Sequence, residues 1–242
     1  MKKILLLVLL VPLSAFSQVS KVDSLAVRVL DRMSDVIGDL HSCSYGLKVS
    51  VDKPGLYGLE KHFSENEVYL KGPNKMLVQS KGQDYHKGYW YNGSHMVYYS
   101  YNENNYSVVD APDSIIKTID SIHTHYGVEF PAADFLYPAF TDDILAEFPT
   151  VVFLGNKKID GKECFHILAD NDKLGVQMWI SNDALTLPVK LVINYKSTVN
   201  GEARQYEATF YDWEMNSDIP NAIFEFNAPP QARQIAIMSK KK

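Results

Sequence analysis

Residues 85–138 read YHKGYWYNGSHMVYYSYNENNYSVVDAPDSIIKTIDSIHTHYGVEFPAADFLYP, and this stretch decides the fold that the sequence predicts. Its first part is rich in tyrosine, which suits a pleated, half-buried strand surface. Asn92-Gly93 is typical of a type I′ hairpin turn, because both residues tolerate positive φ angles. With these two residues as the loop, Tyr91 is expected to face Ser94 across the hairpin.

The second part of this stretch predicts helices. Pro112 begins an apolar stripe with helical spacing, and Gly127 offers a place for the helix to end. Pro131 begins a short turn, and a third helical segment is expected over residues 141–148. A tyrosine-rich sheet followed by helices predicts a helical lid over a curved sheet, and therefore a binding cavity.

The rest of the chain extends this pattern on both sides. Residues 20–40 carry apolar side chains every three or four positions, which predicts an amphipathic helix. Consecutive strands with short turns predict an antiparallel meander, and a sheet of this size should curl because twist accumulates. We therefore predict an α+β, mainly β fold: a curved antiparallel sheet of about eleven strands that forms an unclosed barrel capped by helices. The strands are expected near residues 43–52, 62–70, 75–80, 85–91, 94–101, 106–109, 151–159, 163–169, 175–180, 189–195 and 205–213.

The start of the chain predicts export. A positive beginning, an apolar run over residues 4–13 and a small-x-small cleavage site ending at Ser17 are typical of a secretory signal peptide, residues 1–17. The apolar run is about half the roughly 20 residues that a membrane-spanning helix needs. The cleavage site lacks a cysteine to which a lipid could be attached. We therefore expect one soluble domain, residues 18–242, in the periplasm.

Charge and cysteine content limit the partners. The chain has 29 acidic and 24 basic residues, a formal net charge of −5, which disfavours nucleic acid and anionic membrane surfaces as partners. Cys43 and Cys164 are the only cysteines. A disulfide between them would persist in the periplasm, and two free buried cysteines are the alternative.

Two pairs of residues are candidates for chemistry. His123 and His125 point about 200° apart on a helix, whereas helical metal ligands usually have i, i+4 spacing. Cys164 and His166 share a strand face, which suits a thiolate–imidazole pair, two metal ligands or a structural role. The sequence contains no glycine-rich phosphate loop, serine elbow or paired-cysteine zinc spacing. We predict no catalytic residue, no metal and no cofactor.

The walls of the predicted cavity should be apolar and aromatic. Core packing and ligand lining obey the same burial statistics, so the sequence does not separate them. The candidates come from both runs of strands and from the helices between them. We predict that the cavity is lined by Tyr89, Trp90, Met96, Ile119, Phe135, Leu136, Phe165, Trp179, Tyr206 and Phe210.

The order of elements and several short motifs resemble the periplasmic lipoprotein carrier LolA and the outer-membrane receptor LolB. Within that superfamily, the chain is most similar to a family of predicted periplasmic proteins of unknown function. The likeness covers most of the chain after residue 83, and the order of the motifs is more specific than any one of them. The motifs are YNG (91–93) through DAP (110–112), FPAADFL (130–136), CFH (164–166), QMWI (177–180), LPVK (187–190), DW (212–213) and FEFNAPP (224–230).

The resemblance implies a cavity that accepts acyl chains or another apolar ligand, and it does not imply an enzyme. The lipoprotein carrier closes its lid through a strand arginine, whereas the arginines here are Arg28, Arg32, Arg204 and Arg233, outside the first six predicted strands. We expect a periplasmic protein that binds a lipid, lipid-linked or other apolar ligand, as a carrier in envelope lipid or lipoprotein traffic. The alternatives are an envelope sensor or scaffold with a protein partner, and a Cys/His metal or thiol enzyme.

Overall fold

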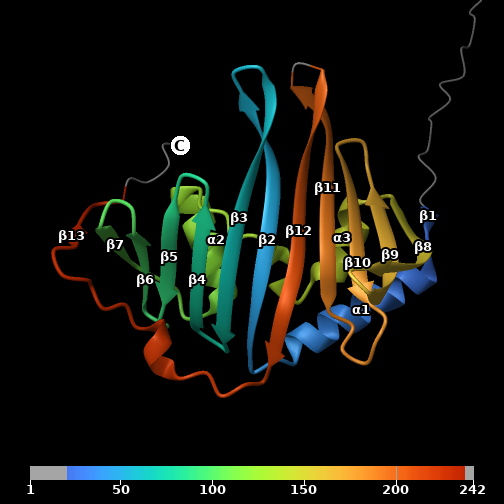
Figure 1. Ribbon diagram of the computed structural model, residues 1–242. Helices are drawn as coiled ribbons and strands as arrows, with labels where there is room; N and C mark the ends of the chain where they lie inside the picture. Colours follow the sequence, from blue (N-terminus) through green and yellow to red (C-terminus); the bar gives the residue numbers. More distant parts are fainter. Residues whose placement is uncertain (1–20, 200, 238–242) are drawn as a thin grey trace, which may run out of the picture.

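One curved sheet of 13 strands dominates the computed structural model, which describes residues 21–199 and 201–237 (Figure 1). The predicted signal peptide lies outside the described residues. The strand order in space is β1-β8-β9-β10-β11-β12-β2-β3-β4-β5-β6-β7-β13. The sheet is not closed into a barrel, and the helices lie on its concave side. This is the α+β, mainly β architecture that the sequence predicts.

The first half of the described chain is a helix followed by a six-stranded meander. Helix α1 (Ser24–Gly38) begins after Asp23, whose carboxylate accepts the backbone N–H of Leu25 at 2.8 Å. This side-chain cap satisfies one of the free donors at the start of a helix. The strands of the first meander are β2 (Ser42–Gly55), β3 (Gly58–Lys71), β4 (Lys75–Gly82), β5 (His86–Tyr91), β6 (His95–Ser100) and β7 (Asn105–Asp110).

The lid segment (residues 112–148) contains three short helices between the two meanders. Ser114 caps the first of them, and Gly127 ends it in the left-handed conformation, φ 68°, as the sequence predicts. The third begins after Ala139 without a side-chain cap, one residue before the predicted start at Thr141. The helices are α2 (Ile115–Tyr126), the 3-10 helix η1 (Ala133–Leu136) and α3 (Phe140–Glu147).

The second meander returns to the first and joins it. Strand β12 pairs antiparallel with β2, so the two meanders form one continuous sheet. Two strands exceed the predicted eleven: β1 and β13 have two residues each and pair parallel with β8 and β7 at the edges of the sheet. Alternation does not reveal strands this short. The remaining bounds are β1 (Lys21–Val22), β8 (Thr150–Ile159), β9 (Lys162–Asp170), β10 (Leu174–Ser181), β11 (Pro188–Val199), β12 (Glu202–Met215) and β13 (Arg233–Gln234).

The β5–β6 hairpin differs from its predicted register by two residues. Tyr91 pairs with Met96 rather than with Ser94. The Asn92 side-chain oxygen accepts the backbone N–H of Ser94 at 3.2 Å, and the positive φ, 101°, lies at Gly93. The turn therefore centres on Gly93 and Ser94, one residue later than predicted. Because the resulting shift is two residues, every side chain keeps its face of the sheet.

The sheet buries apolar side chains on both faces. The main core lies between the concave face and the helices and includes Leu47, Ile167 and Met178. On the convex face a smaller cluster holds Phe224, which is fully buried, beside Leu77. Phe224 ends the short 3-10 helix η2 (Asn221–Phe224). The segment after β12 thus covers part of the convex face on its way to β13 (Figure 1).

Both cysteines are buried and free. Cys43 lies in β2 and Cys164 in β9, in different meanders, so the alternative of two separate buried thiols is the one found. Burial raises the pKa of the Cys43 thiol to about 12 and also raises that of Cys164. Both thiols are therefore protonated at neutral pH and poorly reactive.

Candidate functional site

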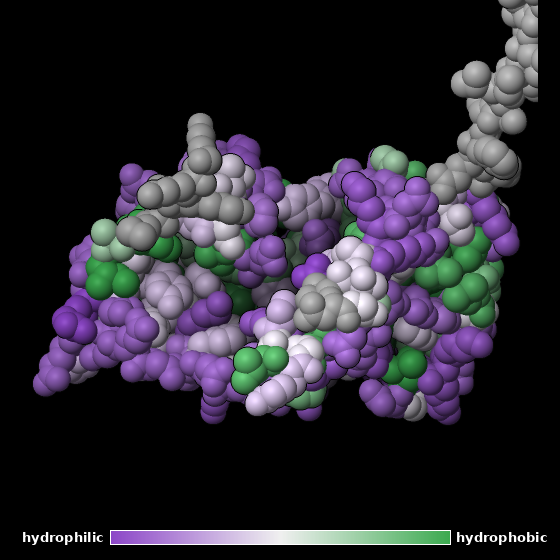
Figure 2. All heavy atoms as spheres, turned by 90° about the horizontal axis from the view of Figure 1, so that it is seen from above, coloured by the Kyte–Doolittle hydropathy of each residue, from purple (hydrophilic) through white to green (hydrophobic). Residues whose placement is uncertain are grey.

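A cavity of about 580 Å³, the main cavity, lies between the concave face and the lid segment. It lies toward the tips of the β2–β3 and β11–β12 hairpins, and the surface is hollowed there when the molecule is viewed from that end (Figure 2). The sheet and the lid segment both contribute apolar walls. These walls include Val49, Val51, Leu191, Ile193, Ile119, Val128 and Phe130.

Strand register places the sheet wall of this cavity. Ile193 on β11 pairs with Tyr206 on β12, which in turn pairs with Val51 on β2. Because paired residues point to the same face, three neighbouring strands present these side chains side by side. Leu191, Ala208 and Val49 form a second row in the same way. Two rows of β-branched, aliphatic and aromatic side chains therefore form an apolar floor.

The lid side of the main cavity adds acidic groups. Asp120, Glu129 and Asp134 line it there, whereas Lys53 lines it from the sheet side. The Tyr137 hydroxyl donates to Asp120 at 2.6 Å and ties α2 to the residue that follows η1. The cavity therefore combines apolar walls with charged groups of both signs.

Tyr206 has a buried hydroxyl without a hydrogen-bond partner among the described residues. Burial raises the pKa of this tyrosine, and the nearby Asp134, Tyr195 and Glu129 raise it further. An unpaired buried hydroxyl is costly, so buried polar atoms are normally satisfied by protein or water. This hydroxyl marks a place in the cavity wall where a polar group fits.

Asp134 is a carboxyl group of this cavity with a raised pKa. Water reaches it inside the cavity, yet protein surrounds much of it, and this desolvation together with Glu129 raises its pKa. A carboxyl whose pKa is raised on folding favours the folded state while it is protonated. Its contribution to the free energy of unfolding is therefore lost as pH rises through the folded-state pKa. Replacing Asp134 with asparagine should therefore raise the free energy of unfolding at pH 7 and leave it unchanged in acid, below the pKa of the unfolded chain. Urea unfolding across this pH range measures the difference, and a variant less stable than wild type at pH 7 would contradict the assignment.

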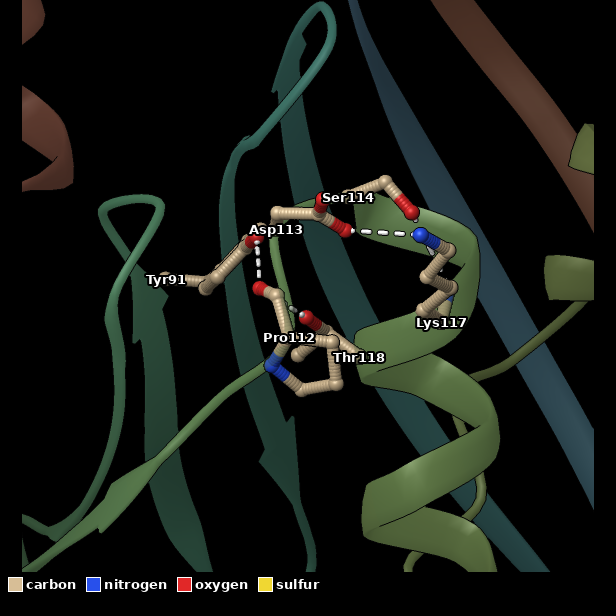
Figure 3. Close-up of polar contacts among 6 residues, drawn as sticks. All are labelled: Tyr91, Pro112, Asp113, Ser114, Lys117 and Thr118. Atoms are coloured by element: carbon tan, nitrogen blue, oxygen red, sulfur yellow. Dashed lines mark hydrogen bonds and ion pairs between the residues drawn. The ribbon is translucent and has the colours of Figure 1, made fainter.

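The lid segment is fixed to the sheet at the start of α2 (Figure 3). The carbonyl oxygen of Pro112 accepts hydrogen bonds from the hydroxyls of Tyr91 on β5, at 2.5 Å, and Thr118 on α2, at 3.3 Å. An exposed ion pair between Asp113 and Lys117, at 2.9 Å, lies beside it. Tyr91 is fully buried, so this anchor connects the interior of the sheet with the first turn of the helix.

Removing the Tyr91 hydroxyl should loosen this anchor. The Tyr91→Phe change keeps the ring and deletes the donor to Pro112, which should lower the free energy of unfolding by about 0.5–1.5 kcal/mol. Tyr57→Phe is the matched control, because Tyr57 is 95% exposed. Hydrogen exchange of the α2 amides should rise in Tyr91→Phe alone. Equal exchange in both variants would show that the anchor does not hold the helix.

The family of the chain follows from comparison with known proteins. The model of a family described as a predicted periplasmic protein, DUF2092, matches residues 26–238. The chain belongs to the DUF2092 family. This match confirms the resemblance that the motifs predict and the periplasmic localisation. No curated protein matches the chain. Within residues 21–199 and 201–237, no helix has the length and apolarity needed to cross a membrane.

Solved structures with a similar fold share little sequence with this DUF2092 chain. An uncharacterised conserved protein from Thermus thermophilus matches with a TM-score of 0.50 and 10% identity, over 87% of this chain and 98% of that one. Lipoprotein LppX of Mycobacterium tuberculosis matches at 0.49 and 13%, over 82% and 98%. A LolA superfamily protein from Nitrosomonas europaea matches at 0.36 and 12%, over 83% and 97%. The Thermus thermophilus protein therefore has a similar fold.

The structure brings some of the predicted lining residues of this DUF2092 protein to cavities. Ile119 and Tyr206 line the main cavity. Leu136 lines a second pocket at the other end of the sheet. Tyr89 and Met96 lie on the concave face and border a hollow of only about 10 Å³. Contact of any of these side chains with a ligand remains a proposal.

Three predicted lining residues are packed in the concave core. Phe135 on η1 meets Phe210 on β12 with ring centroids 5.7 Å apart, in an edge-to-face arrangement. Phe165 on β9 meets Phe153 on β8 at 6.1 Å. Such aromatic pairs fill space between the sheet and the lid. Phe165 and Phe210 lie on the concave face of the sheet, and Phe135 faces it from η1. Packed side chains rather than a cavity surround all three.

The two predicted tryptophans lie on the other face of the sheet, which corrects their assignment as cavity lining. Trp90 packs with Phe226 at 5.0 Å, under the C-terminal segment on the convex face. Trp179 stacks on His166 at 4.3 Å, and its neighbour in sequence, Met178, belongs to the concave core. Side chains alternate between the faces of a strand, so Trp179 points away from the main cavity.

Cys164 and His166 do not form a reactive pair. The Cys164 thiol donates to the carbonyl oxygen of Lys162 at 3.5 Å, and the His166 Nε2 pairs with the Gln177 side-chain oxygen at 3.1 Å. Burial raises the pKa of the thiol and lowers that of the imidazole. Both effects favour the neutral forms, whereas a catalytic pair needs a thiolate beside an imidazolium.

The two histidines of α2 lie in different surroundings. His123 lines the main cavity, whereas His125 bonds through Nδ1 to the carbonyl oxygen of Ser121 at 2.7 Å. Among the described residues, no three His, Cys, Asp or Glu side chains gather closely enough to hold a metal ion. The two rings therefore do not form a metal site together.

The largest omission in the predicted lining is the loop between α2 and η1. Val128, Glu129, Phe130, Pro131 and Ala132 all border the main cavity. Part of this loop belongs to the FPAADFL motif, whose apolar and small residues were a signal in the sequence. Its position over the sheet depends on contacts across the molecule, which periodicity does not report.

Proposed function

We propose that this DUF2092 protein binds a lipid, a lipid-linked molecule or another apolar ligand in the main cavity, as a periplasmic carrier. The observation that carries the proposal is a cavity of about 580 Å³ with apolar rows on the sheet and both apolar and acidic side chains on the lid segment opposite. Small-molecule sites usually measure about 300–1,000 Å³. The cavity is therefore large enough for part of an acyl chain or a compact apolar molecule.

The polar groups of the cavity suit an amphiphile. Asp120, Glu129 and Asp134 lie on the lid side, Lys53 lies on the sheet side, and the Tyr206 hydroxyl lacks a partner among the described residues. A few polar groups in an apolar site orient a ligand. The apolar part of the ligand would contact the two sheet rows, and its polar end would lie among the charged side chains.

Loading would be a physical rather than a chemical process. The lid segment would move away from the sheet while its start stays attached through Pro112 and Tyr91. Acyl chains would then replace lid side chains against the sheet. Each methylene removed from water contributes on the order of 0.8 kcal/mol, so a chain of about a dozen carbons offsets many lost lid contacts.

The experiment is lipid extraction and mass spectrometry of the protein purified from its periplasm, together with titration of a fluorescent fatty acid. The proposal expects a reproducible apolar ligand, or saturable uptake of the probe. Protein that is repeatedly empty and takes up no probe would contradict it. Metal analysis and the Cys164→Ser variant test the enzyme alternative, which expects bound metal or a lost activity.

A second candidate, a protein-interaction module, is favoured by the β2–β3 hairpin tip. Leu56 and Tyr57 are 83% and 95% exposed there, and Phe63 on β3 is 57% exposed. Exposed apolar side chains that gather in one place often mark an interaction surface. Crosslinking in cells separates the two functions, because a stoichiometric protein partner without bound lipid favours the module.

A further inference from the structure

A second pocket, the distal pocket, lies at the end of the sheet opposite the main cavity. It measures about 210 Å³ and is bordered by the end of α1, the start of β2, the β3–β4 turn, the start of α2 and the end of η1. Its described lining contains no Asp, Glu, Lys or Arg. The side chains used below are Cys43, Leu70, Ile116 and Leu136. This pocket is more apolar than the main cavity.

A narrow hollow, the constriction, lies between the two spaces. It measures about 10 Å³ and shares Ile119, Phe130 and Ala133 with the main cavity. It shares Leu70 and Leu136 with the distal pocket. The three spaces therefore follow one another along the concave face, under the lid segment.

Positions along β2 give the length of this path. Val49 borders the main cavity and Cys43 the distal pocket, six residues apart on one strand. At about 3.3 Å per residue, this separation is about 20 Å. A compact apolar molecule does not bridge such a distance, whereas an extended hydrocarbon chain does.

We propose that the distal pocket holds the far end of a long, unbranched hydrocarbon chain whose polar end lies in the main cavity. The inference rests on the proposed function and specifies its ligand. Two observations identify the occupant. The constriction shares wall residues with both spaces and so places them in one row, and Asp, Glu and Lys side chains line the main cavity but not the distal pocket.

Passage through the constriction requires small movements. Ile119 on α2 and Leu136 on η1 border it, and both belong to the lid segment. Aliphatic side chains change rotamer far faster than helices move. The chain end therefore passes when these side chains turn, while the anchor at Pro112 stays closed.

The test measures how affinity depends on chain length. Neutral monoacylglycerols of about 8 to 20 carbons displace a fluorescent probe from wild type, with up to about fourfold tighter binding per added methylene. Ile116→Trp fills the distal pocket and should leave short chains unaffected, while affinity stops rising for chains that reach past the constriction. Lys117→Trp is the matched control, because Lys117 is exposed on the same helix and should behave as wild type.

A second measurement does not depend on the tryptophan variant. In Cys164→Ser protein, Cys43 is the remaining thiol and lies in the wall of the distal pocket. Because this thiol is buried and its pKa is raised to about 12, its alkylation by iodoacetamide is followed at alkaline pH, where the free protein reacts. Saturating long-chain monoacylglycerol should slow the reaction, and saturating short-chain monoacylglycerol should not. Equal alkylation rates with both ligands would overturn the inference.

The outcomes separate this inference from the proposed function. Short-chain binding with no further gain for long chains in wild type would overturn the distal site and leave the main cavity supported. A gain that persists in Ile116→Trp would also overturn it. Absence of binding at every length would overturn the proposed function, and the distal site with it.

Discussion

Ala133→Trp is expected to block the main cavity and weaken binding of a fluorescent fatty acid at least about tenfold, because displacing two methylenes from an apolar site already costs this much. Ala133 is 8% exposed on η1 and borders both the main cavity and the constriction. An indole at this position occupies the space that an acyl chain would need. Titration of the probe by fluorescence measures the loss.

The same substitution at an exposed site provides the control. Ala222 lies exposed on η2, on the other face of the sheet, and Ala222→Trp should bind the probe like wild type. Added volume in a packed region can destabilise by about 1–3 kcal/mol, so a second variant fills the cavity from the sheet side. Ile193→Trp suits this purpose, because tryptophan is favourable in strands and Ile193 lines the main cavity. Full affinity in both cavity variants would show that the ligand binds elsewhere.

Phe224→Ala is expected to lower the free energy of unfolding by about 3–5 kcal/mol, the usual cost of removing a buried phenylalanine ring. Phe224 is fully buried against the convex face, next to Leu77 and Ile219. Ile219, Ile223 and Phe226 also pack at this face, and Phe224 is the most deeply buried apolar side chain of the segment. Loss of its ring should therefore loosen the segment and expose part of the convex face of β4 and β5. Urea unfolding measures the change in stability, and proteolysis of the segment measures its release.

An exposed phenylalanine on the same sheet is the matched control. Phe63 on β3 is 57% exposed, and Phe63→Ala should change stability by about 0.5 kcal/mol or less. Similar losses in the two variants would mean that Phe224 contributes no more than a surface side chain. Probe binding in Phe224→Ala, measured where the protein is folded, should stay close to wild type because the main cavity lies on the other face.

Most of the fold could be predicted from local patterns in the sequence. Alternation along β2 and three- and four-residue spacing in α1 and α2 predicted these elements, because burial on one side imposes these periods. Gly127 ends α2 as predicted, since a residue without a Cβ adopts its positive φ at the lowest cost. The strands β1 and β13 are too short to show a period. The register of the β5–β6 turn was not predicted correctly. Asn92 stands before the turn, where its side-chain oxygen accepts the backbone N–H of Ser94, instead of being one of the two central turn residues.

The candidate site was harder to predict than the fold. Tyr89 and Trp90 are neighbours in sequence and suit a strand equally well, yet one lies in the concave core and the other under the C-terminal segment. Both faces of this part of the sheet are covered, so hydrophobicity does not say which face holds the cavity. Trp179 was assigned to the wrong face for the same reason. Its indole stacks on His166 and is partly buried on the convex side of the sheet.

The sequence by itself determined that this chain forms a curved antiparallel sheet with a helical lid, because strand and helix periods are local properties of neighbouring residues. Only the tertiary structure decided where the lid leaves the sheet uncovered. The space between Ile193, Tyr206 and Phe130 depends on how β11, β12 and the loop before η1 meet, although Ile193 and Tyr206 lie 63 and 76 residues after Phe130 in the chain. A cavity is the volume that packing leaves unfilled, and a lining side chain is as apolar as a packed one. Its location therefore follows from long-range geometry and not from the pattern of any single segment.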